Sequence, residues 1–262
     1  MTVVPIHAGN PGPMTGSGNW TYLLPGARPV LVDAGVGRAE HLDALAAQVP
    51  GGPDRVLVTH AHPDHASGAP ALARRFPAAR FLKWPWPERD PAAVAWAALA
   101  AGEVVETDQG PLTVVHTPGH SPDHVVLWHR DSGTAFTGDL LVAGSTVVIP
   151  ASRGGRLSDY LRSLATVASL ELRRALPAHG PPIEDPAALI ASYVTHRQFR
   201  ERQVVDALRA GVGDPAVIAA GLYDGLDPAL RPMAEESVLA HLVKLADEGR
   251  AVVDGDTWRL VG

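Results

Sequence analysis

The chain has 262 residues, of which 46% are hydrophobic, and it carries a formal net charge of −6 at pH 7. This length and apolar content are sufficient for one large domain and one small domain, each with a packed core. The sequence contains no cysteine, which excludes disulfide bonds and thiolate metal ligands and fits a reducing cytoplasm.

The amino-terminal segment carries no pattern of membrane or secretory targeting. Residues 1–10 lack a basic segment followed by a long apolar core, which is the pattern of a secretory signal. No apolar run in the chain approaches the length that a membrane span requires. We therefore expect a cytoplasmic protein that has no membrane partner.

Residues 1–184 have the pattern of an α/β domain. Short β-rich runs alternate there with Ala- and Leu-rich stretches, and such alternation predicts strands and helices in turn. We expect helices at 40–49, 68–75 and 158–170.

The most informative segment follows the apolar run 56–58 and places three imidazoles and one carboxylate within six residues. His60 and His62 are two residues apart and can lie on one side of an extended segment. Asp64 and His65 come after the strand end, where the chain can turn and direct them elsewhere. Four polar side chains would be costly to bury there without a partner, so the cluster predicts a metal site suited to two adjacent ions.

Each of three later segments presents one further candidate ligand at the end of an apolar run. A Pro-Gly turn precedes His120, a glycine precedes Asp139, and a glycine follows His179. Turn-forming residues at these positions leave room for the chain to direct a side chain away from the strand. The repeated pattern indicates that these residues complete the metal site.

The composition changes after the proline-rich segment 181–186, and the last part of the chain is predicted to be helical. Asp185 can cap a helix that begins at Pro186 and runs to about residue 210. Further elements, two helices and a hairpin with Asp-Gly at its turn, are expected at 215–223, 233–248 and 250–261. These elements predict a winged-helix domain at 185–262, after a catalytic domain at 1–184.

Taken together, these motifs resemble the metallo-β-lactamase superfamily, whose motif order is H-x-H-x-D-H, a distant His, an Asp and a final His. The turn 33–35, after the apolar run 30–32, also resembles that family's early strand pair. The resemblance implies an αββα sandwich, in which two packed sheets have helices outside and metals at one edge. The ligand set that it implies is His60, His62 and His120 for one metal, Asp64, His65 and His179 for the second, and Asp139 as a bridge.

Within that superfamily the chain is similar to the β-lactamase-like protein 2 branch. The matching segments are 117–124, 138–147, 178–181, the pair His196-Arg197 ahead of Arg200-Glu201, and the winged-helix tail. Members of the branch include single-strand endoribonucleases and thioesterases that release polyketide acids from a carrier protein. Membership of the branch therefore leaves the substrate open.

The ligand chemistry predicts a hydrolase. Imidazole and carboxylate ligands without thiolates fit Zn²⁺, here two ions per chain, although Fe or Mn is also accepted. Two such ions about 3.5 to 4 Å apart lower the pKa of a bridging water, and the resulting hydroxide attacks the substrate. Asp64 has two candidate roles, as a metal ligand and as the catalytic group that orients this water or accepts its proton.

Four neighbouring residues have both a supporting and a purely structural interpretation. Asp123 and His124 could hydrogen-bond the ligands, or they could simply begin the strand that comes next. Thr59 and Thr137 could likewise bond to ligands or serve as β-branched strand residues.

A thioester or ester of a small acyl group is the first predicted substrate, and single-stranded RNA is the alternative. Residues 185–262 contain eight basic and twelve acidic side chains, whereas a nucleic-acid-binding domain is normally basic. We therefore expect the winged helix to cover the active-site edge, line a substrate channel or form an oligomer contact rather than grip a duplex. A non-catalytic nucleic-acid-binding module is disfavoured, because every ligand position is present.

Two further segments are candidate substrate contacts. Lys83, Arg153 and Arg156 could meet phosphates, and Trp84 and Trp86 could stack on bases. The same residues could hold a pantetheine or an acyl chain. The alternative is a solvated loop with an aromatic cap.

Overall fold

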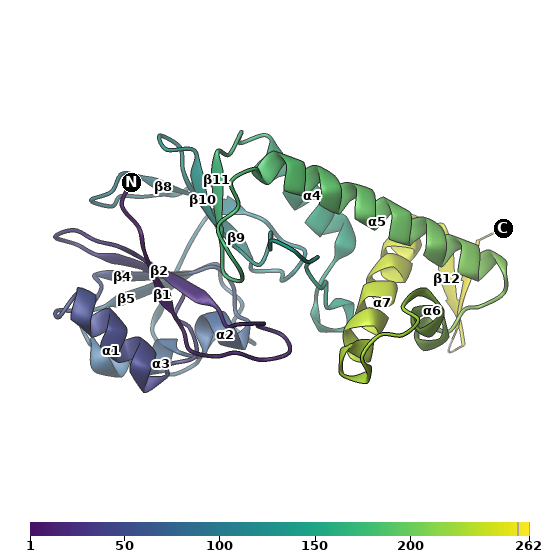
Figure 1. The fold of residues 1–262 in the computed structure, drawn as a ribbon, viewed down its shortest axis with the longest axis horizontal. Helices are drawn as coiled ribbons and strands as arrows, with labels where there is room; N and C mark the ends of the chain where they lie inside the picture. Colours follow the sequence, from purple (N-terminus) through teal and green to yellow (C-terminus); the bar gives the residue numbers. More distant parts are fainter. Residues whose placement is uncertain (256, 262) are drawn as a thin grey trace.

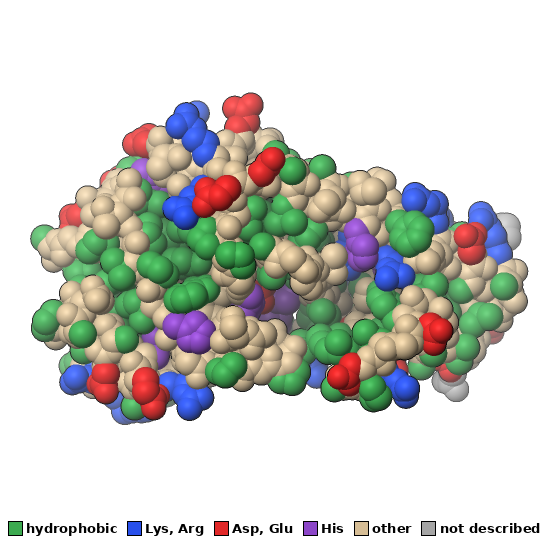
Figure 2. All heavy atoms as spheres, viewed as in Figure 1, with side chains coloured by type: hydrophobic (Ala, Val, Ile, Leu, Met, Phe, Trp, Pro, Cys, Tyr) green, Lys and Arg blue, Asp and Glu red, His purple; other side chains and the backbone are tan. Residues whose placement is uncertain are grey.

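The structure is a computed structural model that describes residues 1–255 and 257–261. A sheet-rich lobe holds the first part of the chain, and a smaller helical lobe holds the carboxyl-terminal part (Figure 1). Helix α5 (Pro186–Arg209) joins the two lobes along one side of the molecule. The space-filling view shows a hollow between the lobes, with histidine and acidic side chains inside it (Figure 2).

One sheet of the large lobe has six strands in the order β1-β2-β3-β4-β5-β6. The strands are β1 (Val4–His7), β2 (Trp20–Leu24), β3 (Val30–Val32), β4 (Arg55–Val58), β5 (Arg80–Lys83) and β6 (Trp96–Ala98). The first three pair antiparallel, and β3 to β6 pair parallel. All residues of β4 are buried, as expected for a parallel strand that is covered on both faces.

The second sheet has five strands in the order β11-β10-β9-β8-β7. The strands are β7 (Val104–Val105), β8 (Leu112–His116), β9 (Val125–His129), β10 (Thr134–Gly138) and β11 (Arg174–Pro177). Only β10 and β11 pair parallel in this sheet. Their register shifts between Phe136 and Gly138, and such a bulge changes the direction of the residues after it.

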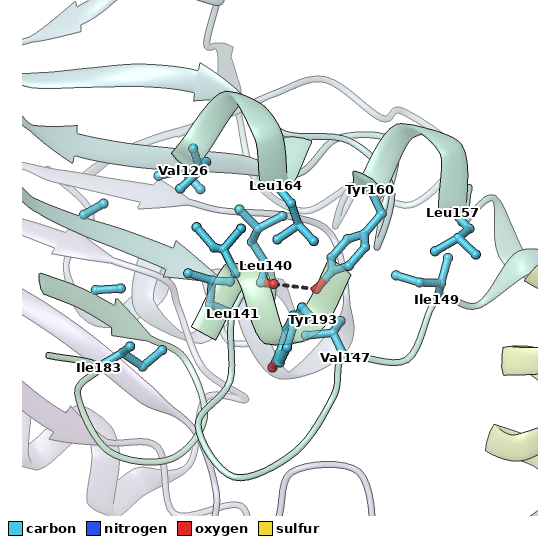
Figure 3. Close-up of a cluster of buried hydrophobic side chains, with 14 of the residues drawn as sticks. Val126, Leu140, Leu141, Val147, Ile149, Leu157, Tyr160, Leu164, Ile183 and Tyr193 are labelled. Atoms are coloured by element: carbon cyan, nitrogen blue, oxygen red, sulfur yellow. Dashed lines mark hydrogen bonds between the residues drawn. The ribbon is translucent and has the colours of Figure 1, made fainter. Parts of the chain in front are cut away.

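Buried clusters on and between the two sheets make the large lobe an αββα sandwich. Leu57 of the first sheet and Phe136 of the second belong to the cluster between the sheets. The outer helices are α1 (Ala39–Gln48), α2 (Pro63–Ala66), α3 (Ala69–Arg75) and α4 (Leu157–Ala168). Leu72 packs with the first sheet, whereas Leu164 and Tyr160 of α4 pack with the second (Figure 3). The predicted α/β class and αββα sandwich are confirmed, and the three predicted helices lie within two residues of α1, α3 and α4.

The small lobe has the predicted winged-helix fold. Its elements after α5 are α6 (Pro215–Leu222), α7 (Arg231–Asp247), β12 (Ala251–Asp254) and β13 (Thr257–Leu260), with a 3-10 turn at Pro228–Leu230. Another 3-10 turn, Ala151–Arg153, precedes α4. Asp185 caps α5 by accepting a hydrogen bond from the amide of Ala188 at 3.0 Å, and Asp214 caps α6. The hairpin between β12 and β13 also contains position 256, which lies outside the described residues.

Helix α5 contributes to both cores. Ile190 and Tyr193 in its first half belong to the core of the large lobe, and Val204 and Leu208 in its second half belong to that of the small lobe. The predicted domain boundary between residues 184 and 185 therefore places α5 in the carboxyl-terminal domain, although this helix packs against both lobes. No helix in the described part of the chain is long and apolar enough to cross a membrane.

Candidate metal centre

Seven ionisable side chains gather at one edge of the sandwich, where several strands end. His60 and His62 follow β4, and Asp64 and His65 lie on the short helix α2. The other three, from the segments after β8, β10 and β11, are His120, Asp139 and His179. The structure therefore brings together all seven residues that the sequence motifs single out, in two adjoining groups.

The first group consists of His60, His62, His120 and one carboxylate oxygen of Asp139. His62 Nδ1 lies 3.0 Å from His60 Nε2 and 2.8 Å from His120 Nε2. Asp139 Oδ2 lies 3.4 Å from His120 Nε2 and 4.0 Å from His60 Nε2. Four potential ligand atoms thus face one small space.

The second group consists of Asp64, His65, His179 and the other carboxylate oxygen of Asp139. Asp139 Oδ1 lies 3.4 Å from His65 Nε2 and 3.3 Å from His179 Nε2. Asp64 Oδ2 lies 3.4 Å from His65 Nε2 and 3.1 Å from His179 Nε2. Because its two oxygens face different groups, the Asp139 carboxylate connects the two spaces.

Hydrogen bonds on the far side of two imidazole rings determine which nitrogen carries the proton. His120 Nδ1 donates to the carbonyl of Val148 at 2.8 Å, and His65 Nδ1 donates to the carboxylate of Asp33 at 2.8 Å. Carbonyl and carboxylate oxygens only accept, so Nε2 of each ring carries a lone pair when the ring is neutral. These lone pairs point into the two groups.

Asp33 also fixes His60, through Thr59. The amide and the hydroxyl of Thr59 donate to Asp33 Oδ1 at 2.8 and 2.9 Å. The hydroxyl oxygen of Thr59 is then free to accept from His60 Nδ1, which lies 3.1 Å away. One buried carboxylate therefore orients one ring in each group, the arrangement by which carboxylates commonly support metal-binding histidines.

Burial and neighbouring charges give the two groups different proton affinities. Burial lowers the pKa of His60 well below its ordinary value and that of His62 to about 3, and neighbouring imidazoles lower both further. Burial acts in the same direction on His65 and His179, but the carboxylates of Asp64 and Asp139 outweigh it. They raise the pKa of His65 well above its ordinary value and that of His179 to about 10. His60 and His62 therefore offer neutral imidazoles, whereas the second group attracts positive charge.

The atoms of both groups fit a divalent cation. His65 Nε2 and Asp139 Oδ1 are buried and lack a hydrogen-bond partner among the described residues. Burial without a partner is costly for such polar atoms unless a cation accepts their lone pairs. Tetrahedral ligands about 2.0 Å from one Zn²⁺ lie about 3.3 Å apart, and the contacts within the groups range from 2.8 to 4.0 Å. Nitrogen and oxygen ligands also suit iron and manganese. The cluster is thus a site for divalent metal.

His124 and Gly138 hold Asp139 in place. The amide of Asp139 donates to His124 Nε2 at 3.1 Å, and His124 Nδ1 bonds the hydroxyl of Thr117 at 2.8 Å. Gly138 has φ of +46°, and a Cβ there would lie 2.7 Å from His124 Nε2, so only glycine fits. His124 therefore supports the site as well as preceding β9. By contrast, the Thr137 hydroxyl is buried without a hydrogen-bond partner in the described chain.

A cleft of about 600 Å³ opens onto the donor atoms between the two lobes (Figure 2). Its floor includes His120, Asp139 and His179. One side is formed by the segments 13–17 and 142–148 of the large lobe. The other side is formed by the small lobe and includes Arg197, Tyr223, Leu226, Leu230, Met233, Ala234 and Ser237. The small lobe therefore covers the active-site edge and lines the cleft, one of the arrangements expected from the sequence.

The predicted substrate contacts at Lys83, Arg153 and Arg156 lie elsewhere. Lys83 is 1% exposed and bonds the carboxylates of Asp90 and Asp123 at 2.6 and 2.8 Å. Its interpretation as a phosphate contact is wrong, because a buried ammonium between two carboxylates is unavailable to a substrate. The same ion pair makes Asp123 a partner of Lys83 rather than of the metal ligands.

The remaining residues of those two segments also lie outside the cleft. Trp84 stacks on His116 with ring centroids 3.7 Å apart, which fits the aromatic-cap alternative. Arg156 forms an exposed ion pair with Asp247 of α7. Arg153 is exposed, and neither it nor Trp84, Trp86 or Arg156 is among the residues that line the cleft.

Three residues of the site were not singled out by the sequence motifs as functional. Asp33 follows the buried strand β3, and the parallel pairing of β3 with β4 places it beside Thr59; a carboxylate directly after an apolar run was the available signal. Asn19 is buried and donates through its side-chain amide to the carbonyl of Asp64 at 2.8 Å. Arg197 belongs to a segment that carries the family resemblance, but that segment indicates no role for it, because only the packing of α5 brings it to the cleft.

Comparison with known families agrees with this architecture. Residues 14–179 match the family described as Metallo-beta-lactamase superfamily, and residues 215–258 match the Beta-lactamase associated winged helix domain. The first match covers more than half of the chain and contains all seven donor residues.

Two curated relatives extend over most of the chain. An Atrochrysone carboxyl ACP thioesterase of Aspergillus fumigatus is 35% identical over 79% of this chain and 65% of its own length. A Beta-lactamase-like protein 2 homolog of Drosophila melanogaster is 32% identical over 95% of this chain and 89% of its own length. The aligned part thus spans slightly less than two thirds of the fungal protein and most of the insect one.

A solved structure shares the whole two-lobe arrangement. A metallo-beta-lactamase family protein from Thermus thermophilus superposes with a TM-score of 0.83 over 99% of this chain and 98% of its own. The two sequences are 23% identical, so this likeness concerns the fold.

Proposed function

The chain belongs to the metallo-beta-lactamase superfamily and is a metal-dependent hydrolase, and we propose that it is a dinuclear zinc enzyme acting on thioesters or esters of small acyl groups. His60, His62 and His120 would hold one zinc ion, and Asp64, His65 and His179 the other. Asp139 would bridge them, since its two oxygens face the two groups. Bound ions would supply a water of lowered pKa and positive charge opposite the substrate oxygen.

The roles of the protein side chains follow from the reaction. Hydrolysis forms a bond between the water oxygen and the acyl carbon, breaks the bond from that carbon to sulfur, and releases a thiolate that takes up a proton and becomes the free thiol. Asp64 is our candidate for the catalytic group that orients the water and accepts its proton. The second group lowers the pKa of Asp64 below its ordinary range, because the charge of His65 and a hydrogen bond from His179 outweigh its burial.

The cleft is the observation that carries the choice of substrate. Its small-lobe side presents Leu226, Leu230 and Met233 to the space above the donor atoms, and apolar side chains of this kind favour an acyl group. The relative from Aspergillus fumigatus is named a carboxyl ACP thioesterase, which supports the same reaction class. A zinc-dependent thioesterase is therefore our first candidate.

Single-stranded RNA is the alternative, and the charge of the cleft disfavours it. Arg197 is the one lysine or arginine among the described residues that line the cleft, whereas proteins that bind single strands usually follow the phosphates with several cations. The eight basic and twelve acidic residues of 185–262 point the same way. This surface would therefore contribute little electrostatic binding free energy to a polyanion.

The test compares hydrolysis of a pentanoyl thioester of N-acetylcysteamine with cleavage of a labelled single-stranded RNA. Wild type, Asp139→Ala and Asp131→Ala are assayed with equal zinc added, and the metal content of each protein is measured. Asp131 is exposed in the turn at the opposite end of β10 from Asp139, so it controls for loss of a carboxylate.

We expect two zinc ions per chain and thioester turnover in wild type and Asp131→Ala, and loss of both in Asp139→Ala. RNA cleavage that is lost only in Asp139→Ala would instead favour the endoribonuclease alternative. If the wild type binds two zinc ions and hydrolyses no thioester or ester, the proposed substrate class is wrong.

A further inference from the structure

Arg197 is a buried cation beside the donor atoms. It lies on α5, is 2% exposed, and lines the same cleft as His120, Asp139 and His179. Arginine is rarely buried to this extent unless a carboxylate or another acceptor pairs with it. The groups that balance the positive charge of Arg197 therefore help to identify the ligand of the cleft.

The protein supplies only part of the acceptors and negative charge that the Arg197 guanidinium requires. One terminal nitrogen of Arg197 donates to the carbonyl of Val147, and the guanidinium lies 5.6 Å from the ring centroid of Tyr160. Its Nε is buried without a hydrogen-bond partner, and no described carboxylate lies within 4.0 Å of the group. Tyr160 is itself held by a hydrogen bond to the carbonyl of Leu140 (Figure 3), so the ring that faces Arg197 is fixed.

The nearest acidic residue on the same helix is already paired. The carboxylate of Glu201 bonds Lys244 at 2.7 Å and Arg250 at 2.8 Å. Arg200, three residues after Arg197, adds a second positive charge and stacks on Tyr223 at 4.4 Å. Asp139 is the acidic residue that lines the cleft, and it faces the imidazoles. The surroundings of Arg197 are thus deficient in negative charge.

We propose that Arg197 binds an anionic group, a carboxylate or a phosphate, of the acyl thioester that the enzyme hydrolyses. This inference rests on the proposed function and adds a property of its substrate. The buried guanidinium is positioned by Val147 and Tyr160 and needs no reorganisation on binding, and such a charge-assisted contact is strong where water is excluded. The anion can belong to the acyl part or to the thiol part of the substrate.

Three thioesters distinguish these sources. Pentanoyl-N-acetylcysteamine is neutral, glutaryl-N-acetylcysteamine carries a carboxylate on the acyl part, and pentanoyl-4′-phosphopantetheine carries a phosphate on the thiol part. Each is assayed with wild type, Arg197→Met, Arg197→Lys and the control Arg202→Met. Arg202 is exposed on the same helix, and methionine keeps much of the length of the side chain while removing its charge.

We expect kcat/KM for one anionic thioester to fall at least tenfold in Arg197→Met, with little change for the neutral thioester or in Arg202→Met. Arg197→Lys should recover part of the loss, because lysine keeps the charge but not the planar fork. Equal losses for all three thioesters would mean that Arg197 only supports the 142–148 segment, and would overturn the inference. An unchanged preference in Arg197→Met would overturn it as well.

A binding measurement separates this inference from the proposed function. Calorimetric titration of glutarate and of inorganic phosphate into the zinc-loaded proteins should show binding that is at least tenfold weaker in Arg197→Met than in Arg202→Met. If no thioester is hydrolysed, the proposed function fails, and with it the assignment of the anion to a thioester. If thioesters are hydrolysed but both anions bind both variants equally, Arg197 is not an anion site and the hydrolase assignment stands.

Discussion

The cleft has a polar floor and an apolar wall, and the two are built in different ways. The floor takes its donor atoms from several strand ends, and buried hydrogen bonds such as that from His65 to Asp33 hold them. The apolar wall consists of Leu226, Leu230 and Met233 of the small lobe, half-buried side chains that pack without directed bonds. Reaction chemistry and substrate choice should therefore be separable by mutation.

The largest expected effect is on the floor, at Asp64. In Asp64→Asn the side chain keeps its shape but cannot accept a proton, and we expect kcat to fall by about 10²- to 10⁴-fold. Steady-state kinetics together with metal analysis checks this prediction, with Asp131→Asn as the matched control. Wild-type kcat in the Asp64→Asn protein would remove Asp64 from the mechanism.

A smaller effect is expected at Asp33, which supports the floor without facing the cleft. Asp33→Asn removes one of the oxygens that accept from His65 and Thr59, and we expect metal affinity to fall about 10- to 100-fold. Competition with a fluorescent chelator measures this affinity. Asp54→Asn is the control, because Asp54 pairs with Arg55 at the opposite end of β4. Equal affinities in the two variants would contradict the orienting role of Asp33.

Changes in the wall should alter substrate preference and leave the metals in place. For Leu230→Ser or Met233→Ser we expect kcat/KM for a pentanoyl thioester to fall about tenfold relative to an acetyl thioester, because less apolar area is buried. Val217→Ser is the control, since Val217 is 55% exposed in the small lobe and does not line the cleft. An unchanged preference would mean that the acyl group lies elsewhere.

The smallest effect concerns the acid stability of the lobe that carries the wall. His241 of α7 is buried, and burial lowers its pKa to about 3, with the positive charges of Arg197, Lys244, His196 and Arg200 adding to the effect; Glu201, at 4.0 Å, is the nearest carboxylate. The unfolded chain takes up this proton near pH 6.5, whereas the folded chain does not. The contribution of His241 to the free energy of unfolding is therefore fully present above pH 6.5. It falls as the pH drops below 6.5, and about 1.4 kcal/mol of it is lost at pH 5.5.

Urea unfolding at pH 7.5 and 5.5 checks this value. In His241→Leu the difference between the two pH values should shrink by about the same amount, because the titrating group is gone. His196→Leu is a control with a less buried ring, and it should keep most of the pH dependence. The same pH dependence in wild type and His241→Leu would contradict the prediction.

The fold and the donor residues were predictable because their signals are local. The motif from His60 to His65 directly follows a buried strand, and Asp139 and His179 also stand just after strands. Polar residues at strand ends meet at one edge of a sandwich, so the pattern predicts their convergence. The capping residue Asp185 marked the start of α5 in the same way.

The supporting contacts were not predictable, because they depend on how distant segments pack. The bond between Asp33 and His65 requires the pairing of β3 with β4. The sequence indicates that Lys83 is an available cation. In the fold, Asp123, forty residues later, forms an ion pair with the buried Lys83 ammonium. Nothing near Arg197 in sequence indicates the cleft, which exists only because the lobes meet. Tertiary packing, rather than local pattern, decides such positions.

The continuity of α5 places a constraint on the length of the chain. Between Tyr193, in the core of the large lobe, and Val204, in that of the small lobe, the helix is unbroken. One inserted residue in such a helix rotates the downstream part of the chain by about 100° and advances it by about 1.5 Å. Insertions or deletions between these two residues would therefore turn the small lobe away from the donor atoms, even though most of the intervening side chains never meet a substrate.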